Sequence, residues 1–173
     1  MTALPPPAPL VLQPGSGFPV QAGERPVTVM AGPDLTGGLL LAEQEIPPGA
    51  LVPVHRHAAA TQWCYVIEGT LHVTAGGEVL AVRAGGYFIR PAGTWHAVWN
   101  PSTTQTARQV EGTLPGQQML ELFLRMEVLR RAGLLTPASL AEAGAPLGTS
   151  YDRAATARIE KAYGVSAGPG WQA

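Results

Sequence analysis

Three of the four histidines in this chain fall in two short clusters, the second of which ends in the only asparagine. In the first cluster, one residue separates His55 from His57, and four residues separate His57 from Gln62. In the second cluster, three residues separate His96 from Asn100. On a strand, His55 and His57 would share one face, because side chains alternate between the two faces. Three imidazoles with one oxygen ligand suit Fe(II), Mn(II), Ni(II), Cu(II) or Zn(II). The spacing therefore predicts one divalent transition metal ion, held by His55, His57, Gln62 and His96.

The segments around these residues have the pattern of short strands. From residue 27 to residue 111, runs rich in β-branched and aromatic residues alternate with turns that contain Gly or Pro, which is typical of an all-β sandwich or barrel. We expect strands at 27–30, 39–46, 51–57, 62–67, 70–74, 79–83, 87–90, 95–99 and 106–111. The histidine pair, Gln62 and His96 then come from three different strands and can meet in one cavity.

The last third of the chain changes to helical periodicity. Apolar residues recur every three or four positions over 118–132, and Gly133 can end that helix. A short helix opens at Thr136-Pro137 and ends before Gly144, and a third covers about 150–163. We therefore expect a Pro-rich N-terminal arm (1–26), either loose or laid along a sheet edge, a β-barrel (27–116), and a helical extension (117–173) that packs on the barrel.

Composition excludes several classes of function. The formal net charge is −1, and the ten arginines and single lysine are spread along the chain, so we expect no nucleic-acid partner and no membrane partner. Cys64 is the only cysteine, which excludes an intrachain disulfide and a cysteine-based zinc site. The N-terminal residues lack a basic segment followed by an apolar run, and no stretch reaches the roughly 18 apolar residues of a membrane helix. We therefore expect a cytoplasmic location.

The two clusters resemble the two conserved motifs of the cupin superfamily. These motifs read G-x5-H-x-H-x(3–4)-E-x6-G and G-x5-P-x-G-x2-H-x3-N. The chain carries the same spacing in Gly49, His55, His57, Gln62 and Gly69, and in Gly85, Pro91, Gly93, His96 and Asn100. Gln62 stands where the motif has Glu. Looser marks over roughly residues 27–170 resemble small single-domain cupins that are labelled quercetin 2,3-dioxygenase-like. The resemblance implies a mainly β fold, the cupin double-stranded β-helix, which is a small barrel.

The glutamine changes the chemistry that the resemblance implies. In cupin dioxygenases the Glu is a ligand, and in flavonol cleavage it is thought to deprotonate the substrate. A carboxylate can accept a proton, whereas an amide only makes hydrogen bonds and ligates weakly through its oxygen. With Gln62 the site keeps a charge near +2 and favours an anionic ligand. No catalytic residue is assigned, and the candidates for that role are a metal-bound water and Gln62.

Three functions stay open on this interpretation. The first is a ring-cleaving dioxygenase similar to quercetinases, acting on a small aromatic or carbonyl-containing molecule. The second is a non-oxidative cyclase, isomerase or lyase, because some cupins with a Gln ligand resemble polyketide cyclases. The third is a non-catalytic small-molecule binder. We expect an enzyme of one of the first two classes, and O2 consumption separates them.

The strand pattern also predicts which side chains surround a substrate. Cys64 has the strand parity of the glutamine ligand, and Val66, Phe88 and Val98 are candidates for the apolar lining that a pocket requires. Arg90 could bind an anionic group of the substrate or be solvated. We further expect a homodimer, because barrels of this kind expose sheet faces and the arm could cross to a partner.

Overall fold

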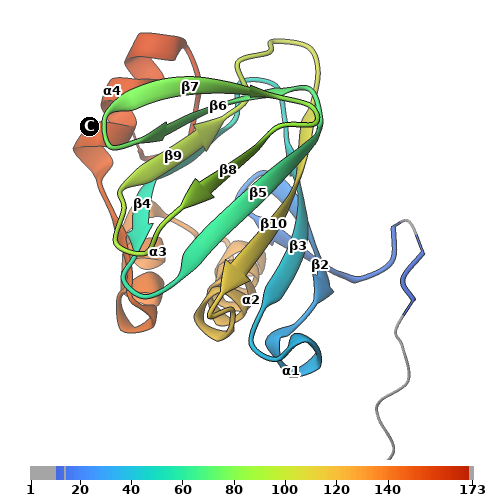
Figure 1. The fold of residues 1–173 in the computed structure, drawn as a ribbon. Helices are drawn as coiled ribbons and strands as arrows, with labels where there is room; N and C mark the ends of the chain where they lie inside the picture. The colour runs from blue at the N-terminus through green and yellow to red at the C-terminus, as the bar shows by residue number, and fades with distance from the viewer. Residues whose placement is uncertain (1–10, 14, 172–173) are drawn as a thin grey trace, which may run out of the picture.

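Two antiparallel β-sheets face each other, and the longer helices follow them in the chain (Figure 1). This computed structural model describes residues 11–13 and 15–171. One sheet has six strands, in the spatial order β1 (Phe18–Ala22), β2 (Arg25–Ala31), β3 (Leu40–Ile46), β10 (Ala107–Leu114), β5 (Thr61–Glu68) and β8 (Tyr87–Arg90). The other has five, in the order β11 (Thr149–Tyr151), β4 (Leu51–His57), β9 (His96–Trp99), β6 (Thr70–Ala75) and β7 (Glu78–Arg83). The predicted mainly β fold with C-terminal helices is confirmed.

The interior between the sheets is apolar at one end and polar at the other. Alternate residues of the central strands point inward, and Ile46, Val66, Leu71 and Val98 are fully buried there. Towards the start of β5 and the end of β10 the inward positions become polar, with Gln62 directly opposite Thr113. A polar group buried without a partner is costly. The polar end of the interior is therefore where a ligand or metal is expected.

The helices close the molecule around this polar end. They are α2 (Gln117–Arg131), α3 (Pro137–Gly144), the short 3-10 helix η1 (Ala145–Leu147) and α4 (Arg153–Tyr163). Because its apolar residues recur at helical spacing, α2 buries Met119, Leu122, Phe123 and Met126 against β1, β2 and β3. On the other sheet, α4 packs against β4. The fold thus places helices beside the strands that carry the histidines.

Inside the predicted arm, Phe18–Ala22 forms β1 at the edge of the six-stranded sheet, which is one of the two arrangements expected for that segment, while residues 1–10 and 14 of the arm lie outside the described part. The structure differs from the predicted elements in two places. The helix predicted from about residue 150 begins at Arg153, because Thr149–Tyr151 pairs with β4 as a strand. A single helical turn, α1 (Pro33–Thr36), was not predicted. The strand of the C-terminal extension, β11, lies beside His55 and His57 and so belongs to the site.

The outer face of the six-stranded sheet carries exposed apolar side chains. Trp63 and Tyr65 on β5 lie beside Ile89 and Tyr87 on the edge strand β8, and all four are exposed. Large exposed apolar groups often mark interaction surfaces. Homodimerisation stays a prediction. Among the described residues, no helix has the length and apolarity needed to cross a bilayer.

Candidate metal centre

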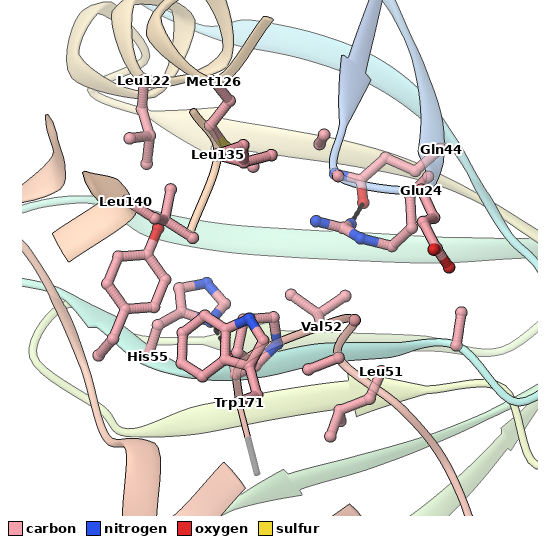
Figure 2. Close-up of a pocket in the computed structure, with 18 of the residues that line it drawn as sticks. Glu24, Gln44, Leu51, Val52, His55, Leu122, Met126, Leu135, Leu140 and Trp171 are labelled. Atoms are coloured by element: carbon pink, nitrogen blue, oxygen red, sulfur yellow. Dashed lines mark hydrogen bonds between the residues drawn. The ribbon is translucent and has the colours of Figure 1, made fainter. Parts of the chain in front are cut away.

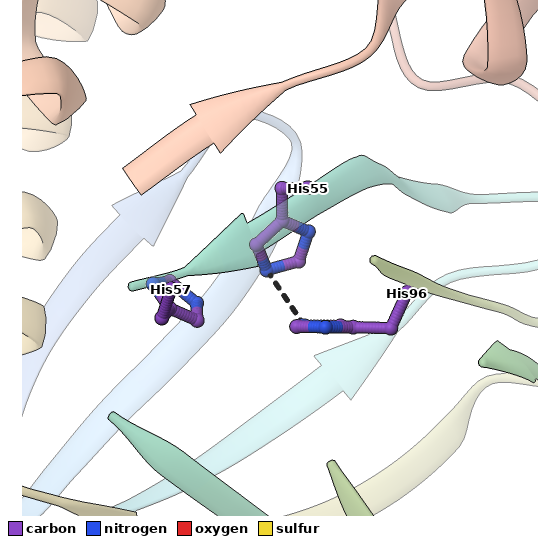
Figure 3. A group of neighbouring side chains, drawn as sticks. All are labelled: His55, His57 and His96. Carbon is purple, nitrogen blue, oxygen red and sulfur yellow. Dashed lines mark hydrogen bonds between the residues drawn. The ribbon is translucent and has the colours of Figure 1, made fainter. Parts of the chain in front are cut away.

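Neighbouring strands bring the three predicted histidines together. His55 and His57 lie on β4 and point inward, and His96 begins β9, where its backbone is in register with His55 (Figure 3). One ring nitrogen from each of the three lies within 4.8 Å of the others, and all three side chains are buried. Strand alternation and one antiparallel pairing are therefore sufficient to build the cluster.

Backbone carbonyls fix the orientation of two of the rings. His55 Nδ1 lies 2.7 Å from the Pro53 carbonyl oxygen, and His96 Nδ1 lies 2.8 Å from the Thr94 carbonyl oxygen. A carbonyl only accepts, so in both rings Nδ1 carries the proton and Nε2 keeps its lone pair. The two Nε2 atoms are 3.2 Å apart. Two lone pairs at that separation repel each other unless a cation lies between them.

The third ring completes the arrangement. His57 Nδ1 lies 3.0 Å from the Thr149 hydroxyl oxygen on β11, and its Nε2 is buried with no partner among the described residues. Burial lowers the pKa of all three imidazoles, to about 4 for His57, to about 2 for His96 and well below its usual value for His55. The rings are therefore neutral near pH 7, which is the form that binds a metal.

Gln62 lines the same pocket as His55 and His57. Its Nε2 donates to Glu111 Oε1 at 3.1 Å and to the Thr113 hydroxyl at 3.3 Å. Because a carboxylate oxygen can only accept, these contacts fix which end of the amide is the nitrogen and leave the oxygen as the free acceptor. Gln62 Oε1 is buried and has no partner in the described part of the chain. Three neutral imidazoles and this orphaned oxygen fit the predicted divalent metal.

A buried ion pair lies behind the glutamine. Arg90 Nη2 is 2.6 Å from Glu111 Oε2 and 2.9 Å from Cys64 Sγ, and the side chains of Arg90 and Glu111 are each 4% exposed. Burial raises the pKa of the Cys64 thiol, so the sulfur stays protonated. The solvated alternative for Arg90 is therefore wrong, because its guanidinium is paired with Glu111 inside the protein.

A pocket of about 140 Å³ opens from the histidine cluster towards the helices (Figure 2). Of the residues predicted for the site, His55, His57, Gln62 and Arg90 line this pocket, whereas His96 joins the cluster but is not among the lining residues. The other predicted lining residues are not among those that surround it: Cys64, Val66, Phe88 and Val98. Val66 and Val98 belong to the apolar core, and Phe88 packs against that core. The strand parity was right, but these side chains lie further along the strands.

Sequence reasoning missed much of the pocket wall. Glu111 and Arg25 contribute charged groups, and Tyr151 and Trp171 contribute aromatic rings. The sequence does contain an indication of Glu111, because polar residues occupy alternate positions of β10 and these positions are buried. The other three come from a hairpin and from the C-terminal region, and no local pattern connects those segments to the histidines.

Residues 42–110 match the family model for the cupin domain. This segment is similar to cupin domains, and the match covers less than half of the chain. It contains the three histidines and Gln62, whereas the hairpin of β1 and β2 and all of the longer helices lie outside it.

Curated relatives match over about half of the chain or slightly more. A germin-like protein 5-1 from Oryza sativa subsp. japonica is 32% identical over 51% of this chain and 43% of its own length. A gentisate 1,2-dioxygenase from Ralstonia is 30% identical over 51% of this chain and 27% of its own length. A germin-like protein from Morus alba is 30% identical over 65% and 60%. The chain thus spans less than two thirds of the length of each of these relatives.

Solved structures share the fold at low sequence identity. A predicted oxalate decarboxylase from Thermotoga maritima superposes with a TM-score of 0.55 at 18% identity, covering 61% of this chain and 98% of that protein. The cupin domain of Cnp3 from Schizosaccharomyces pombe gives a TM-score of 0.50 at 16% identity, covering 65% and 74%. These likenesses support the cupin fold and carry no information on the reaction.

Proposed function

We propose that the protein is a mononuclear metal-dependent enzyme that acts on a small aromatic or carbonyl-containing molecule. The observation that carries this proposal is the buried cluster of His55, His57 and His96, two members of which line a pocket together with Gln62, whose amide oxygen has no partner among the described residues. Fe, Mn, Ni, Cu and Zn all suit such a nitrogen and oxygen donor set. A metal bound there would supply Lewis-acid polarisation of a substrate oxygen.

The residues around the cluster prepare it for that role. The Pro53 and Thr94 carbonyls hold two rings by their Nδ1–H groups, which is the usual way that outer contacts orient histidine ligands. The hydrogen bond to Glu111 holds the Gln62 amide in place. The helix side of the pocket is apolar and keeps bulk water away, so electrostatic interactions inside it are strengthened.

We propose oxidative ring cleavage by O2 as the reaction. All four ligands are neutral, so the site favours an enolate or phenolate oxygen as the substrate's contact. Such anions are electron-rich, which is what attack on O2 requires. The similarity to a gentisate 1,2-dioxygenase, confined to 27% of that enzyme's length, agrees with this proposal.

A non-oxidative cyclisation, isomerisation or elimination is the second candidate. The observation that favours it is the absence of a free carboxylate base among the described pocket residues near the histidines, since the Glu111 carboxylate is occupied by Arg90, Gln62 and Thr113. In such a reaction the residues would orient and polarise a carbonyl, and no O2 would be consumed.

Metal content is the first test. The purified protein, and the same protein after incubation with each of the five metals, should carry about one metal ion per chain by elemental analysis. His96→Ala should lose it, whereas His72→Ala should keep it, because His72 lies on β6 outside the cluster and contacts Trp99 edge to face. Metal that is absent from the wild type under every condition, or retained in full by His96→Ala, contradicts the proposal.

An oxygen electrode separates the two reactions. The metal-loaded protein is mixed with a panel of flavonols, catechols and enolisable carbonyl compounds. O2 uptake that depends on both the substrate and His96 supports the dioxygenase. Substrate conversion without O2 uptake supports the second candidate, and binding without any conversion shows a non-catalytic protein.

A further inference from the structure

Arg25 places a buried positive charge in the pocket. It is the first residue of β2, directly after the two-residue Gly23-Glu24 turn of the β1–β2 hairpin, and its side chain is 9% exposed. Arg25 lines the same pocket as His55 and His57. Figure 2 shows His55 at one side of this pocket and Gln44, which accepts a hydrogen bond from Arg25, at the other.

The Arg25 guanidinium has one hydrogen-bond acceptor and no ion-pair partner among the described residues. Among the described residues its only hydrogen bond is to Gln44 Oε1, at 3.3 Å, and no carboxylate lies within 4.0 Å of it. Glu24 also lines the pocket, but it is exposed and makes no ion pair with Arg25 in the described structure. Arginine has five N–H donors and stays protonated in proteins. Its remaining donors are therefore free for a ligand in the cavity.

Burial makes an unpaired guanidinium unfavourable. Charged side chains inside proteins are normally paired, because desolvation penalises the ion. Here burial lowers the pKa of Arg25 and outweighs the attraction of the nearby Glu111, which acts in the opposite direction. Glu111 forms its ion pair with Arg90, which is equally buried. Among the described residues Arg25 has no such ion pair of its own, so an anion that enters the pocket is the group that can satisfy it.

Apolar and aromatic side chains form part of the wall of this pocket, and Gln62, Gln109 and Glu111 form a polar part. Leu122, Phe123 and Met126 of α2 form one side, and Val52, Tyr151 and Trp171 contribute to the others. The Tyr151 ring stacks at 5.9 Å on His55 and lies 5.8 Å from the Trp171 ring. An apolar cavity of about 150 Å³ is large enough for benzene. At about 140 Å³, this cavity fits one ring or an aliphatic group of similar size.

We propose that the substrate is a small organic acid of about one ring, whose carboxylate binds Arg25 while a second oxygen points to the His55, His57 and His96 cluster. A planar guanidinium fork matches a carboxylate and binds it through two parallel hydrogen bonds. The assignment of the second oxygen rests on the proposed metal-dependent function. The carboxylate contact at Arg25 does not, because it needs no metal.

Ligand binding tests the two contacts separately. Benzoate, phenylacetate and 4-hydroxybenzoate, each with its neutral carboxamide, are titrated by calorimetry and saturation-transfer NMR into EDTA-treated and Zn-loaded protein. In the metal-free wild type the acids should bind more tightly than the amides. Arg25→Gln should weaken binding of the acids by roughly 10- to 100-fold and leave the amides unchanged, as expected for loss of hydrogen bonds to a charged group.

Control variants keep the test independent of folding. Arg108→Gln removes an arginine that pairs with Glu43 at the sheet surface, and it should bind the acids as the wild type does. Arg25→Met should melt at the wild-type temperature or above, because it removes a buried charge without a partner. A lower melting temperature for Arg25→Met would show that the arginine has a structural role and would overturn the proposal.

The remaining outcomes distinguish this inference from the proposed function. The carboxylate site is refuted if no acid binds the wild type at acid concentrations of about 10 mM, or if Arg25→Gln binds the acids as tightly as the wild type does. This holds even if the protein binds Zn at full occupancy. If the acids bind through Arg25 but Zn is not retained, the carboxylate site stands and the metal-dependent function fails. If both stand, 4-hydroxybenzoate should gain affinity on Zn loading more than benzoate does, because only it carries an oxygen at the end of the ring opposite the carboxylate.

Discussion

Gln62→Glu is the substitution that examines the site most directly. The amide nitrogen of Gln62 lies 3.1 Å from Glu111 Oε1 and donates a hydrogen bond to it. In the variant, a second carboxylate would face Glu111 at the same distance, and a favourable contact would become a repulsive one. The sequence alone suggests that a carboxylate at position 62 strengthens metal binding. The structure indicates in addition that the same carboxylate lowers the free energy of unfolding of the metal-free protein.

The magnitude follows from that distance. Two unit charges 3.1 Å apart repel by about 5 kcal/mol at an effective dielectric constant of about 20. The protein can instead protonate one carboxyl group, which costs about 4 kcal/mol at pH 7 for a group with an ordinary Glu pKa. The cheaper response sets an upper limit, and Arg90, 2.6 Å from Glu111, reduces it. We expect the metal-free variant to lose about 2–4 kcal/mol of unfolding free energy.

Chemical denaturation of EDTA-treated protein measures this loss. Gln62→Met is the matched control, because it removes the same hydrogen bond without adding a charge, and it should lose less stability than Gln62→Glu. The double variant Gln62→Glu/Glu111→Gln exchanges the amide and the carboxylate across one hydrogen bond and should recover part of the loss. Metal should raise the melting temperature of Gln62→Glu more than that of the wild type, since the new carboxylate gains a cation. A metal-free Gln62→Glu protein within about 0.5 kcal/mol of the wild type would refute the contact with Glu111.

Three further substitutions test the surroundings of the site. Thr149→Val removes the hydroxyl 3.0 Å from His57 Nδ1 and should weaken metal binding by roughly tenfold in a chelator competition; unchanged affinity would show that this contact does not orient the ring. Asn100→Ala removes two hydrogen bonds to backbone carbonyl oxygens, at 2.9 and 2.7 Å, and one from a backbone N–H at 2.9 Å. Urea unfolding should therefore show a loss of roughly 2–4 kcal/mol of unfolding free energy, and a loss below about 0.5 kcal/mol would contradict this expectation. Hydrogen bonds from two arginines of α2 and from the Gln21 amide lower the pKa of Glu127 from 4.5 to about 2. The stabilisation from Glu127 is therefore complete above pH 4.5 and lost as the pH falls towards 2, so the difference in melting temperature between Glu127→Gln and the wild type should shrink over that interval, and a difference independent of pH would contradict the assignment.

The strands and the histidine cluster could be predicted because local rules determine them. The pair His55 and His57 needs only strand alternation to share a face, and His96 needs only a neighbouring strand in the right register. The helix α2 follows from its apolar spacing and ends close to the predicted glycine. For these features, each residue type agrees with the local structure that it adopts.

The pocket could not be predicted because it depends on contacts between distant segments. Strand β11 pairs with β4 across about ninety residues, from His57 to Thr149, and that pairing replaced the first turn of a predicted helix. Arg25 reaches the cavity only because its hairpin packs beneath α2. Polar residues at inward positions, such as Glu111, are the one sequence signal that a partner lay inside, since burial without one is costly.

The division between these two groups of residues bears on how relatives can be used. The proposed metal ligands come from residues 42–110, the segment that matches the cupin model, whereas Arg25, the α2 side chains, Tyr151 and Trp171 come from outside it. Similarity over the cupin segment therefore informs about the metal centre. The substrate depends on the N-terminal hairpin and the C-terminal helices, so two chains with the same histidine cluster can act on different molecules. Exchanging Arg25 should change which ligands bind without changing metal content, whereas exchanging His96 should remove the metal and leave the carboxylate contact in place.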